Sequence, residues 1–184
     1  MKHSLRQTIL EKRNALAKQE IHHRSKKIQE HLFELEEYKK SRVVMFYVSF
    51  GNEVFTHDMM RESLKHKTVV VPKVVHREIE PSLIISFDQM IPDNKYGILE
   101  PIDVTRVTLK SINMVLVPGL VFDTHGHRLG YGFGFYDKFL QKIPHAVKVG
   151  LAFDFQSVDE IPKEVHDVPV DVIVTDKEVI RIKK

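Results

Sequence analysis

The chain has 184 residues, a length that suits one folded domain, and its composition is that of a globular protein, with 42% hydrophobic and 29% charged residues. Cysteine is absent, which excludes disulfides, thiolate nucleophiles and cysteine-ligated metals and fits a cytoplasmic protein. The net charge is +3, but residues 1–42 alone hold 11 Lys/Arg against 6 Asp/Glu. We interpret most of these basic side chains as solvated helix faces, because no aromatics alternate with them as in a nucleic-acid module.

The first half of the chain is predicted to contain helices and strands in alternation. Apolar residues recur at helical spacing over residues 4–38, which indicates one broken helix or two successive helices. Thr56 is placed to cap a helix that runs to about Lys65. Proline and glycine predict irregular structure over 88–110. Short β-rich runs predict strands at 42–50, 67–75 and, as a candidate third, 82–87.

The second half is predicted to supply the centre of a sheet. A buried-type strand over 112–119 is followed by a glycine-rich segment and a helix from about 135 to 143. Continuous apolar strands separated by helices are typical of a largely parallel sheet covered on both faces. We therefore expect one α/β domain over residues 1–184. The remaining strands are expected at 146–153, 170–176 and 178–183.

No segment is predicted to cross a membrane. The longest nearly apolar run, residues 114–122, is too short to span a bilayer. The N-terminus is basic and amphipathic and lacks the continuous apolar core of a signal peptide.

Five of the eight glycines lie between Gly119 and Gly134, where residues 127–140 read HRLGYGFGFYDKFL. A strand, a glycine-rich loop and a helix in this order form anion sites in α/β proteins, because glycines let backbone N–H groups approach phosphate oxygens. Arg128 could add a forked counter-charge. The segment fits neither G-x-G-x-x-G nor G-x-x-x-x-G-K-[ST]. From the residues alone, phosphate binding and a purely structural turn both remain open.

The same segment is rich in aromatic rings, some of which a helix start would place in the core. Rings on a loop that holds phosphate could also stack on a flat heterocycle. Asp137 would either complement the helix dipole or ligate Mg²⁺ beside phosphates. His125 and His127 invite a zinc interpretation, but no partner residue has ligand spacing, so we predict no zinc site. The rings are Tyr131, Phe133, Phe135 and Tyr136.

Residues 122–137, FDTHGHRLGYGFGFYD, resemble the signature of the 5-formyltetrahydrofolate cyclo-ligase family, also called methenyltetrahydrofolate synthetase. That signature runs roughly F-D-x-x-G-x-R-L-G-x-G-x-G-[YF]-Y-D. Further parts of the family pattern follow in the expected order along nearly the whole chain, which makes the resemblance specific. They are KHSLR (2–6), SFGNEVFT (49–56), YGILEP (96–101), GLAFDFQ (150–156), IP (161–162) and HDVPVDVIVTD (166–176).

The resemblance implies cyclisation of 5-formyltetrahydrofolate to 5,10-methenyltetrahydrofolate, with ATP as co-substrate, Mg²⁺ as cofactor, and ADP and phosphate as products. In that reaction ATP phosphorylates the formyl oxygen, and N10 then displaces it as phosphate. The resemblance also implies a single three-layer Rossmann-like domain with N-terminal helices. We expect a cytoplasmic monomer that acts on small molecules, polyglutamylated folates being further candidates, without nucleic-acid or membrane partners.

Carried over position by position, the resemblance also implies the site residues. ATP would meet Lys2, His3, Ser4, Leu5, Arg6, Arg128, Leu129, Gly130, Tyr131, Gly132, Phe133, Gly134, Phe135 and Tyr136. The folate would meet Val48, Glu53, Tyr131, Gly132, Phe133, Gly134 and Phe135. Mg²⁺ would meet Asp137 and Asp171, and Arg128 would be catalytic. Phe133 stands where the family often has glycine or lysine, and Phe135 where it often has tyrosine, so a charge contact and a hydroxyl group are absent here.

Two other functions are compatible with the residues. One is a non-catalytic nucleotide- or RNA-binding domain that uses the basic N-terminal helices, and the other is an enzyme acting on a sugar phosphate. RNA binding would not need Glu53, Asp137 and Asp171 together, and a sugar phosphate does not require four rings. Without the resemblance, Lys2 and Arg6 would be interpreted as solvated.

Overall fold

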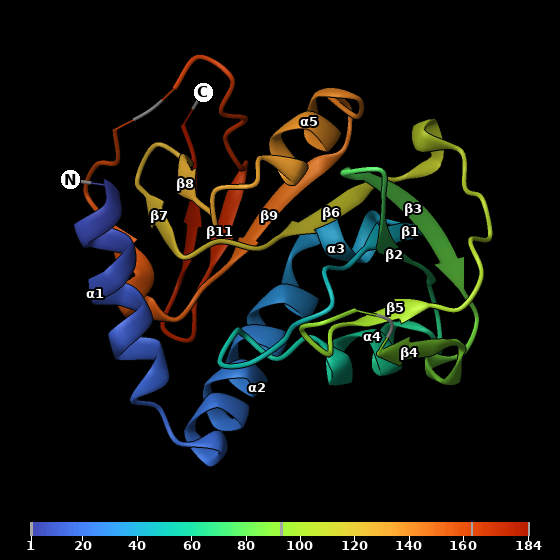
Figure 1. The fold of residues 1–184 in the computed structure, drawn as a ribbon, viewed down its shortest axis with the longest axis horizontal. Coiled ribbons are helices and arrows are strands. Elements are labelled where there is room, and N and C mark those ends of the chain that lie inside the picture. The colour runs from blue at the N-terminus through green and yellow to red at the C-terminus, as the bar shows by residue number, and fades with distance from the viewer. Residues whose placement is uncertain (1, 93, 163, 184) are drawn as a thin grey trace.

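The computed structural model describes residues 2–92, 94–162 and 164–183 and shows helices on both faces of a central sheet (Figure 1). The helices are α1 (Lys2–Asn14), α2 (Lys18–Glu34), α3 (Glu36–Lys40), α4 (His57–Ser63) and α5 (Phe135–Gln141), with 3-10 turns at Phe87–Gln89, Leu109–Ser111 and Asp154–Gln156. The strands of the central sheet are β1 (Val43–Met45), β2 (Thr68–Val75), β3 (Glu78–Ile84), β6 (Met114–Val117), β9 (Val147–Leu151), β11 (Val172–Val174) and β12 (Val179–Arg181). The smaller strands are β4 (Met90–Pro92), β5 (Leu99–Pro101), β7 (Val121–Asp123), β8 (Arg128–Leu129) and β10 (Ser157–Val158).

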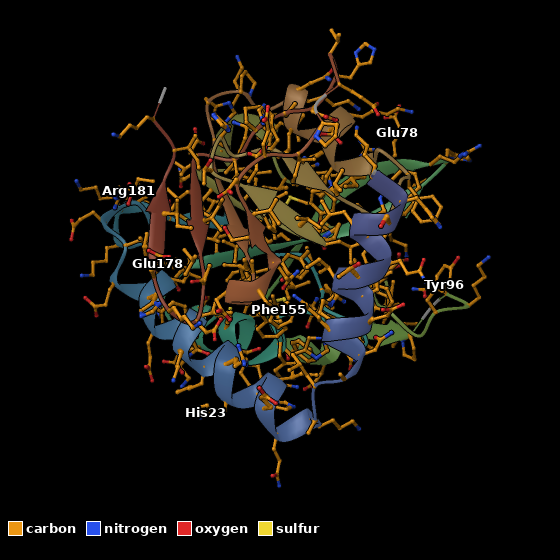
Figure 2. All side chains as sticks on the ribbon, turned by 90° about the vertical axis from the view of Figure 1, so that its left-hand side faces the viewer. His23, Glu78, Tyr96, Phe155, Glu178 and Arg181 are labelled. Atoms are coloured by element: carbon orange, nitrogen blue, oxygen red, sulfur yellow. The ribbon has the colours of Figure 1, made fainter. Side chains whose placement is uncertain are left out.

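Within the described residues the central sheet has seven strands in the order β12-β11-β9-β6-β1-β2-β3. The five inner strands run parallel, and the two edge strands pair antiparallel with their neighbours. Figure 2 labels Glu78 of β3 and Arg181 of β12, which mark the two edges. All four residues of the central strand β6 are buried, as expected for a parallel strand covered on both faces. The predicted largely parallel α/β sheet is confirmed.

Alternate residues of the strands face two hydrophobic cores on opposite sides of the sheet. Val44 and Val69 pack in one core with side chains of α2, α3 and α4. Met45 and Val70 pack in the other core with side chains of α5. Complete burial of such a side chain stabilises the fold by roughly 1.5–3 kcal/mol. The two cores therefore hold the sheet as the middle of three layers, and α1 lies apart from them over β7, where Ile9 packs against Val121.

Several predicted elements are confirmed with shifted bounds. The helical pattern over residues 4–38 forms α1 and α2, with α3 following. The candidate strand at 82–87 is β3, which begins earlier because His76 and Arg77 form a tight turn at positive φ after β2. A helix does begin after Thr56, but the Thr56 hydroxyl donates to the Tyr47 carbonyl instead of capping it.

Two predictions are corrected by the structure. The strand expected over 42–50 is present as β1 but ends at Met45; the Phe46 N–H still donates to the Val70 carbonyl of β2, and the chain then leaves the sheet. Residues 88–110, predicted to be irregular, contain the two-stranded ribbon of β4 and β5. Figure 2 shows Tyr96, which lies between these two strands, projecting at the periphery of the molecule. In the described parts of the chain, no helix is long and apolar enough to cross a membrane.

Candidate active site

A cavity of about 920 Å³ opens beyond the carboxyl ends of β1 and β6. Its walls come from the start of α1, the segment after β1, strands β2 and β3, the β4–β5 ribbon, residues 128–137, Glu164 and Asp167. Ligands of open α/β sheets commonly bind at this edge, because the loops that follow parallel strands converge there. The departure of the chain from the sheet after Met45 brings Val48 and Glu53 into the wall of the cavity.

The glycine-rich loop forms one wall of this cavity. Gly132 and Gly134 have φ values of 98° and 68°, in the left-handed region that favours glycine. A Cβ atom added at either position would meet nothing within 4 Å, so backbone conformation, not space, is what favours glycine there. No described acceptor receives a hydrogen bond from the backbone N–H groups of residues 131–134. The loop therefore presents donors beside the start of α5, as an anion site does.

Arg128 lies under this loop with 8% of its surface exposed. Its Nη1 donates to Asp137 Oδ1 at 2.9 Å and to the Val168 carbonyl at 3.3 Å. The Val168 N–H donates to the same Asp137 oxygen at 3.1 Å. Because both bonds of the guanidinium use Nη1, Nε and Nη2 are the groups with which Arg128 can meet a ligand in the cavity.

Glu53 is a buried carboxylate in the same cavity, with 7% of its surface exposed, and it contacts the glycine-rich loop through Tyr131. Its Oε2 accepts the Phe50 N–H at 3.1 Å, and its Oε1 accepts the Tyr131 hydroxyl at 3.0 Å. Burial raises the pKa of Glu53, and the positive charge of Arg13 opposes that rise. A carboxylate held in this way can accept paired N–H donors from a ligand.

The sequence prediction missed Arg13 as a site residue. Arg13 is 4% exposed, and its Nη2 donates to the Tyr131 hydroxyl at 3.1 Å. Its Nε donates to the Asn52 carbonyl at 3.1 Å. A signal was present in the sequence, because Arg13 follows Arg6 by seven residues, two helical turns, and so lies on the same face of α1.

Tyr136 also lines the cavity and has a polar group that lacks a partner in the described part of the chain. Its hydroxyl is buried and has no hydrogen-bond partner among the described residues. Burial is the main cause that raises the pKa of Tyr136, and the nearby Glu53 carboxylate adds to it. The hydroxyl therefore stays protonated and can donate to a ligand, which would remove the cost of leaving it unsatisfied.

Lys2 and Arg6 line the cavity, whereas the residues between them do not. Lys2 Nζ pairs with Glu164 Oε1 at 2.7 Å, and Arg6 Nε donates to the Gly130 carbonyl at 3.0 Å. The solvated interpretation of these two cations is therefore wrong. His3 and Ser4 are exposed, and Leu5 packs beside the small core under α1, so α1 presents only one face to the cavity.

The two predicted metal ligands are not brought together at this cavity. Asp137 lines it, whereas Asp171 does not. Asp171 lies at the amino end of the parallel strand β11, where its Oδ2 accepts the Lys148 N–H at 2.9 Å. Within residues 2–92, 94–162 and 164–183, no group of three or more His, Cys, Asp or Glu side chains is arranged to hold a metal ion. A shared site for these two carboxylates stays a prediction.

His125 and His127 have a structural setting. The buried carboxylate of Asp123 accepts the backbone N–H groups of both histidines and of Ile161. His127 Nδ1 lies 3.1 Å from Asp123 Oδ2. The Asp123 carboxylate thus organises the turn between β7 and β8.

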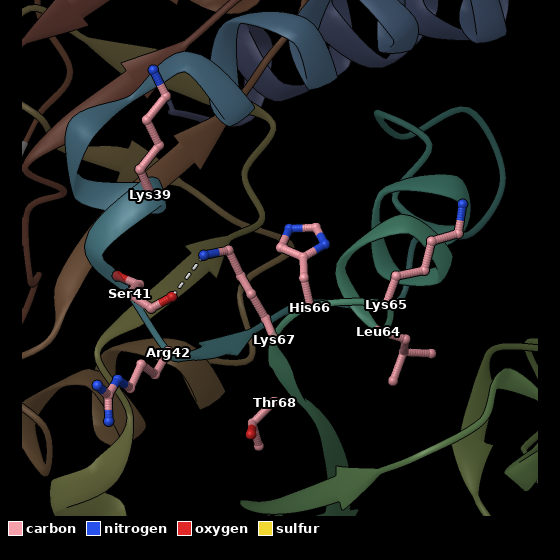
Figure 3. Close-up of a pocket in the computed structure, with 8 residues that line it drawn as sticks. All are labelled: Lys39, Ser41, Arg42, Leu64, Lys65, His66, Lys67 and Thr68. Atoms are coloured by element: carbon pink, nitrogen blue, oxygen red, sulfur yellow. Dashed lines mark hydrogen bonds between the residues drawn. The ribbon is translucent and has the colours of Figure 1, made fainter.

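A second hollow, of about 480 Å³, lies on another part of the surface, at the amino ends of β1 and β2 (Figure 3). Its three lysines are already engaged. Lys67 donates to the carbonyls of Tyr38 and Ser41, both at 2.8 Å, Lys39 pairs with Glu34, and Lys65 pairs with Glu62. It is also open and distant in the fold from the glycine-rich loop, so we assign the functional site to the first cavity.

Fold and cavity together define an α/β protein with a ligand site at the carboxyl edge of a largely parallel sheet. A family model described as the 5-formyltetrahydrofolate cyclo-ligase family matches residues 1–176. The chain belongs to this family and is an enzyme. The resemblance carried by the sequence motifs is confirmed.

Individual relatives agree with this assignment. The chain is 32% identical over 164 residues to a 5-formyltetrahydrofolate cyclo-ligase of Haemophilus influenzae, covering 83% of this chain and 86% of that one. A solved structure of a 5,10-methenyltetrahydrofolate synthetase from Aquifex aeolicus superposes with a TM-score of 0.89 at 37% identity, covering 100% of this chain and 93% of that one. Its counterpart from Mycoplasma pneumoniae has a TM-score of 0.76 at 29% identity, with coverages of 95% and 98%.

Proposed function

We propose that this chain cyclises 5-formyltetrahydrofolate to 5,10-methenyltetrahydrofolate, using ATP and releasing ADP and phosphate. The main support is that one cavity contains both a group of donors suited to bind phosphate and a buried carboxylate suited to bind the pterin of a folate. The donors belong to the glycine-rich loop and Arg128, and the carboxylate is that of Glu53.

The triphosphate of ATP is proposed to lie along the glycine-rich loop, where the N–H groups of residues 131–134 are available. Arg128 and Arg6 flank that loop, and Lys2 lies at the same wall. The Lys2–Glu164 pair is a surface ion pair, with the Glu164 side chain 69% exposed. Such pairs contribute about 0–1 kcal/mol, so Lys2 can exchange Glu164 for a phosphate.

The pterin of the folate is proposed to bind edge-on to Glu53. Its amino-pyrimidinone edge offers paired N–H donors, which a carboxylate accepts well. The Phe133 and Phe135 rings stack at 5.5 Å between centroids, and Phe133 is 62% exposed, so a flat ligand can cover apolar surface there. The unsatisfied Tyr136 hydroxyl is then a further donor toward the folate.

The chemistry requires alignment and charge neutralisation more than a protein nucleophile. The formyl oxygen of 5-formyltetrahydrofolate attacks the γ-phosphorus, the bond to ADP breaks, and the oxygen becomes part of a phosphate ester. N10 then attacks the formyl carbon and loses its proton, and the C–O bond breaks to release phosphate. Arg128 and the loop N–H groups are suited to hold the transferred phosphoryl group in line, and Glu53 to fix the pterin so that N10 can reach the carbon.

Mg²⁺ is proposed to accompany ATP, where it would neutralise phosphate charge. Asp137 fits this role in part: both of its hydrogen bonds end on Oδ1, which leaves Oδ2 to ligate a cation. Magnesium beside a nucleotide commonly uses one or two carboxylates and fills its other positions with phosphate oxygens and water. Asp171 would have to approach the cavity to join it.

The test is to mix the purified protein with Mg-ATP and 5-formyltetrahydrofolate and to follow methenyl absorbance and ADP together. We expect the chromophore and ADP to form in equal amounts and only when both substrates are present. A folded protein that forms ADP without the chromophore, or neither product, would contradict the proposed function.

A further inference from the structure

We propose that Arg13 is a positioning residue for the folate: through the Tyr131 hydroxyl it orients and electrostatically supports the Glu53 carboxylate that receives the pterin. The inference rests on the proposed function, because it concerns the same cavity. It adds a residue that the family motif in the glycine-rich loop does not contain.

The first support is a continuous hydrogen-bonded path. Arg13 Nη2 donates to the Tyr131 hydroxyl at 3.1 Å, and that hydroxyl donates to Glu53 Oε1 at 3.0 Å. No ion pair between described residues joins Arg13 directly to Glu53, so the hydroxyl of Tyr131 is the link. Because the Tyr131 hydroxyl receives a bond from a cation, its own proton is directed at the carboxylate.

The second support is that the Arg13–Tyr131–Glu53 hydrogen-bond path, called the relay below, is held in place by further bonds at both ends. Arg13 Nε donates to the carbonyl of Asn52, the residue immediately before Glu53, and the side chain of Asn52 donates to Asn14. The Glu53 side chain in turn accepts the Phe50 N–H. The carboxyl end of α1 and the turn at residues 50–53 are thus held together, which limits where the Glu53 oxygens can point.

The third support is charge. Among the described residues, the titratable groups that interact electrostatically with Glu53 are Arg13 of α1, Tyr47 after β1, Tyr131 of the glycine-rich loop and Tyr136 of α5. Arg13 is the only cation among them. Burial raises the pKa of Glu53, and Arg13 opposes the rise. Without Arg13, a larger fraction of Glu53 would be protonated at a given pH and would lose acceptor capacity for the pterin.

The same helix therefore serves both ligands. Lys2 and Arg6 at its start face the wall proposed for ATP, and Arg13, about 16 Å further along the helix axis from Lys2, supports the wall proposed for the folate. This separation makes a sharp test available, because a change at Arg13 should affect one substrate and not the other.

The experiment compares Arg13→Met, Arg13→Lys and Tyr131→Phe with the wild type. Lys12→Met is the control, since it removes the same charge from an exposed neighbour on α1. For Arg13→Met we expect the KM for 5-formyltetrahydrofolate to rise about tenfold or more, while the KM for ATP changes less than about twofold. The acid limb of kcat/KM for the folate should move to higher pH, because less positive charge favours the neutral Glu53.

The other variants separate charge from geometry. Arg13→Lys keeps the positive charge but loses the forked guanidinium. The acid limb of its kcat/KM profile should therefore stay near that of the wild type, while its KM for the folate should lie between those of the wild type and Arg13→Met. Tyr131→Phe removes the donor to Glu53 and leaves Arg13 in place, so its folate KM should rise as well. Lys12→Met should match the wild type in both parameters.

Folate binding is measured by calorimetry in parallel with turnover, so that the two hypotheses can fail separately. A wild type that binds folate but does not form the methenyl product would overturn the proposed function, whereas the relay would still be tested by binding to the variants. Unchanged folate affinity and pH profile in Arg13→Met, or equal losses for folate and ATP, would overturn the role of Arg13. If Arg13→Met does not fold, Tyr131→Phe decides, and an unaffected folate affinity there overturns it.

Discussion

Glu53 shows how a buried charge links the site to stability. Because burial raises its pKa, the folded protein binds this proton more tightly than the unfolded chain. The stabilising contribution is then complete below the unfolded pKa of about 4.3 and is lost as the pH rises through the raised folded value. We expect the unfolding free energy of the wild type, relative to Glu53→Gln, to fall over that window. Denaturant titrations of both proteins across the window measure it, and a difference that does not vary with pH would contradict the assignment.

Arg128 is the residue on which the proposed phosphate site depends most. Replacing it by alanine removes the bonds to Asp137 and Val168 and any charge-assisted bond to phosphate, each worth roughly 1.5–3 kcal/mol. We expect kcat/KM to fall about tenfold or more. Steady-state kinetics test this, with Arg106→Ala as a control, because Arg106 is exposed and does not line the cavity. Wild-type kinetics in the Arg128 variant would contradict phosphate binding by Arg128 and would indicate that the glycine-rich loop is only a structural turn.

At the scale of elements, the glycine-rich loop is predicted to work through its backbone conformation. Gly134, the N-cap of α5, has φ 68°, where an L-residue costs roughly 1–2 kcal/mol. Gly134→Ala should therefore raise the KM for ATP, because relief of strain turns N–H groups away from the cavity. Gly97→Ala is the matched control: φ is 70°, a Cβ has open space, and Gly97 does not line the cavity. Both variants should lose stability, but only the first should lose ATP affinity, as calorimetry can determine.

The sequence predicted those helices and strands whose own residues show a clear hydrophobic pattern. Continuous apolar runs identified β6 and β9, and helical spacing identified α1 and α2. The β4–β5 ribbon was missed because strands of three residues, each ending in proline, are too short to show a hydrophobic period. The strand predicted over 42–50 was too long because the apolar residues Phe46, Tyr47 and Val48 are buried in a side-chain core, with only one backbone hydrogen bond between described residues, from Phe46 to Val70, continuing the pairing.

For the candidate site as well, the sequence predicted what neighbouring residues determine and missed contacts between distant parts of the chain. Motif residues at the glycine-rich loop could be placed from the sequence, since strand, loop and helix are consecutive there. The contact of Arg13 with Tyr131 joins residues 118 apart, and nothing local in the sequence predicts it. The family resemblance implied Asp171 as a metal ligand together with Asp137, but Asp171 lies at the amino end of β11, and the amino ends of parallel strands lie at the sheet edge opposite to the cavity.

At the scale of the whole molecule, the central sheet joins distant parts of the chain. β1 pairs with β2 and β6, and β11 near the carboxyl end pairs with β9, so the same sheet spans both halves. We propose that residues 1–184 unfold as one domain. Calorimetry should then give a single transition in which the calorimetric and van 't Hoff enthalpies agree. Two separable transitions would contradict this.

The phosphorylation step is tested most directly by following the formyl oxygen. 5-Formyltetrahydrofolate carrying ¹⁸O in its formyl group is converted by the protein with Mg-ATP, and the released phosphate is analysed by mass spectrometry. The proposed phosphoryl transfer to that oxygen places one ¹⁸O atom in each phosphate formed. Unlabelled phosphate, with the ¹⁸O released as water, would contradict the phosphorylation step for which the Arg128 wall and the Glu53 wall are proposed to align the two substrates.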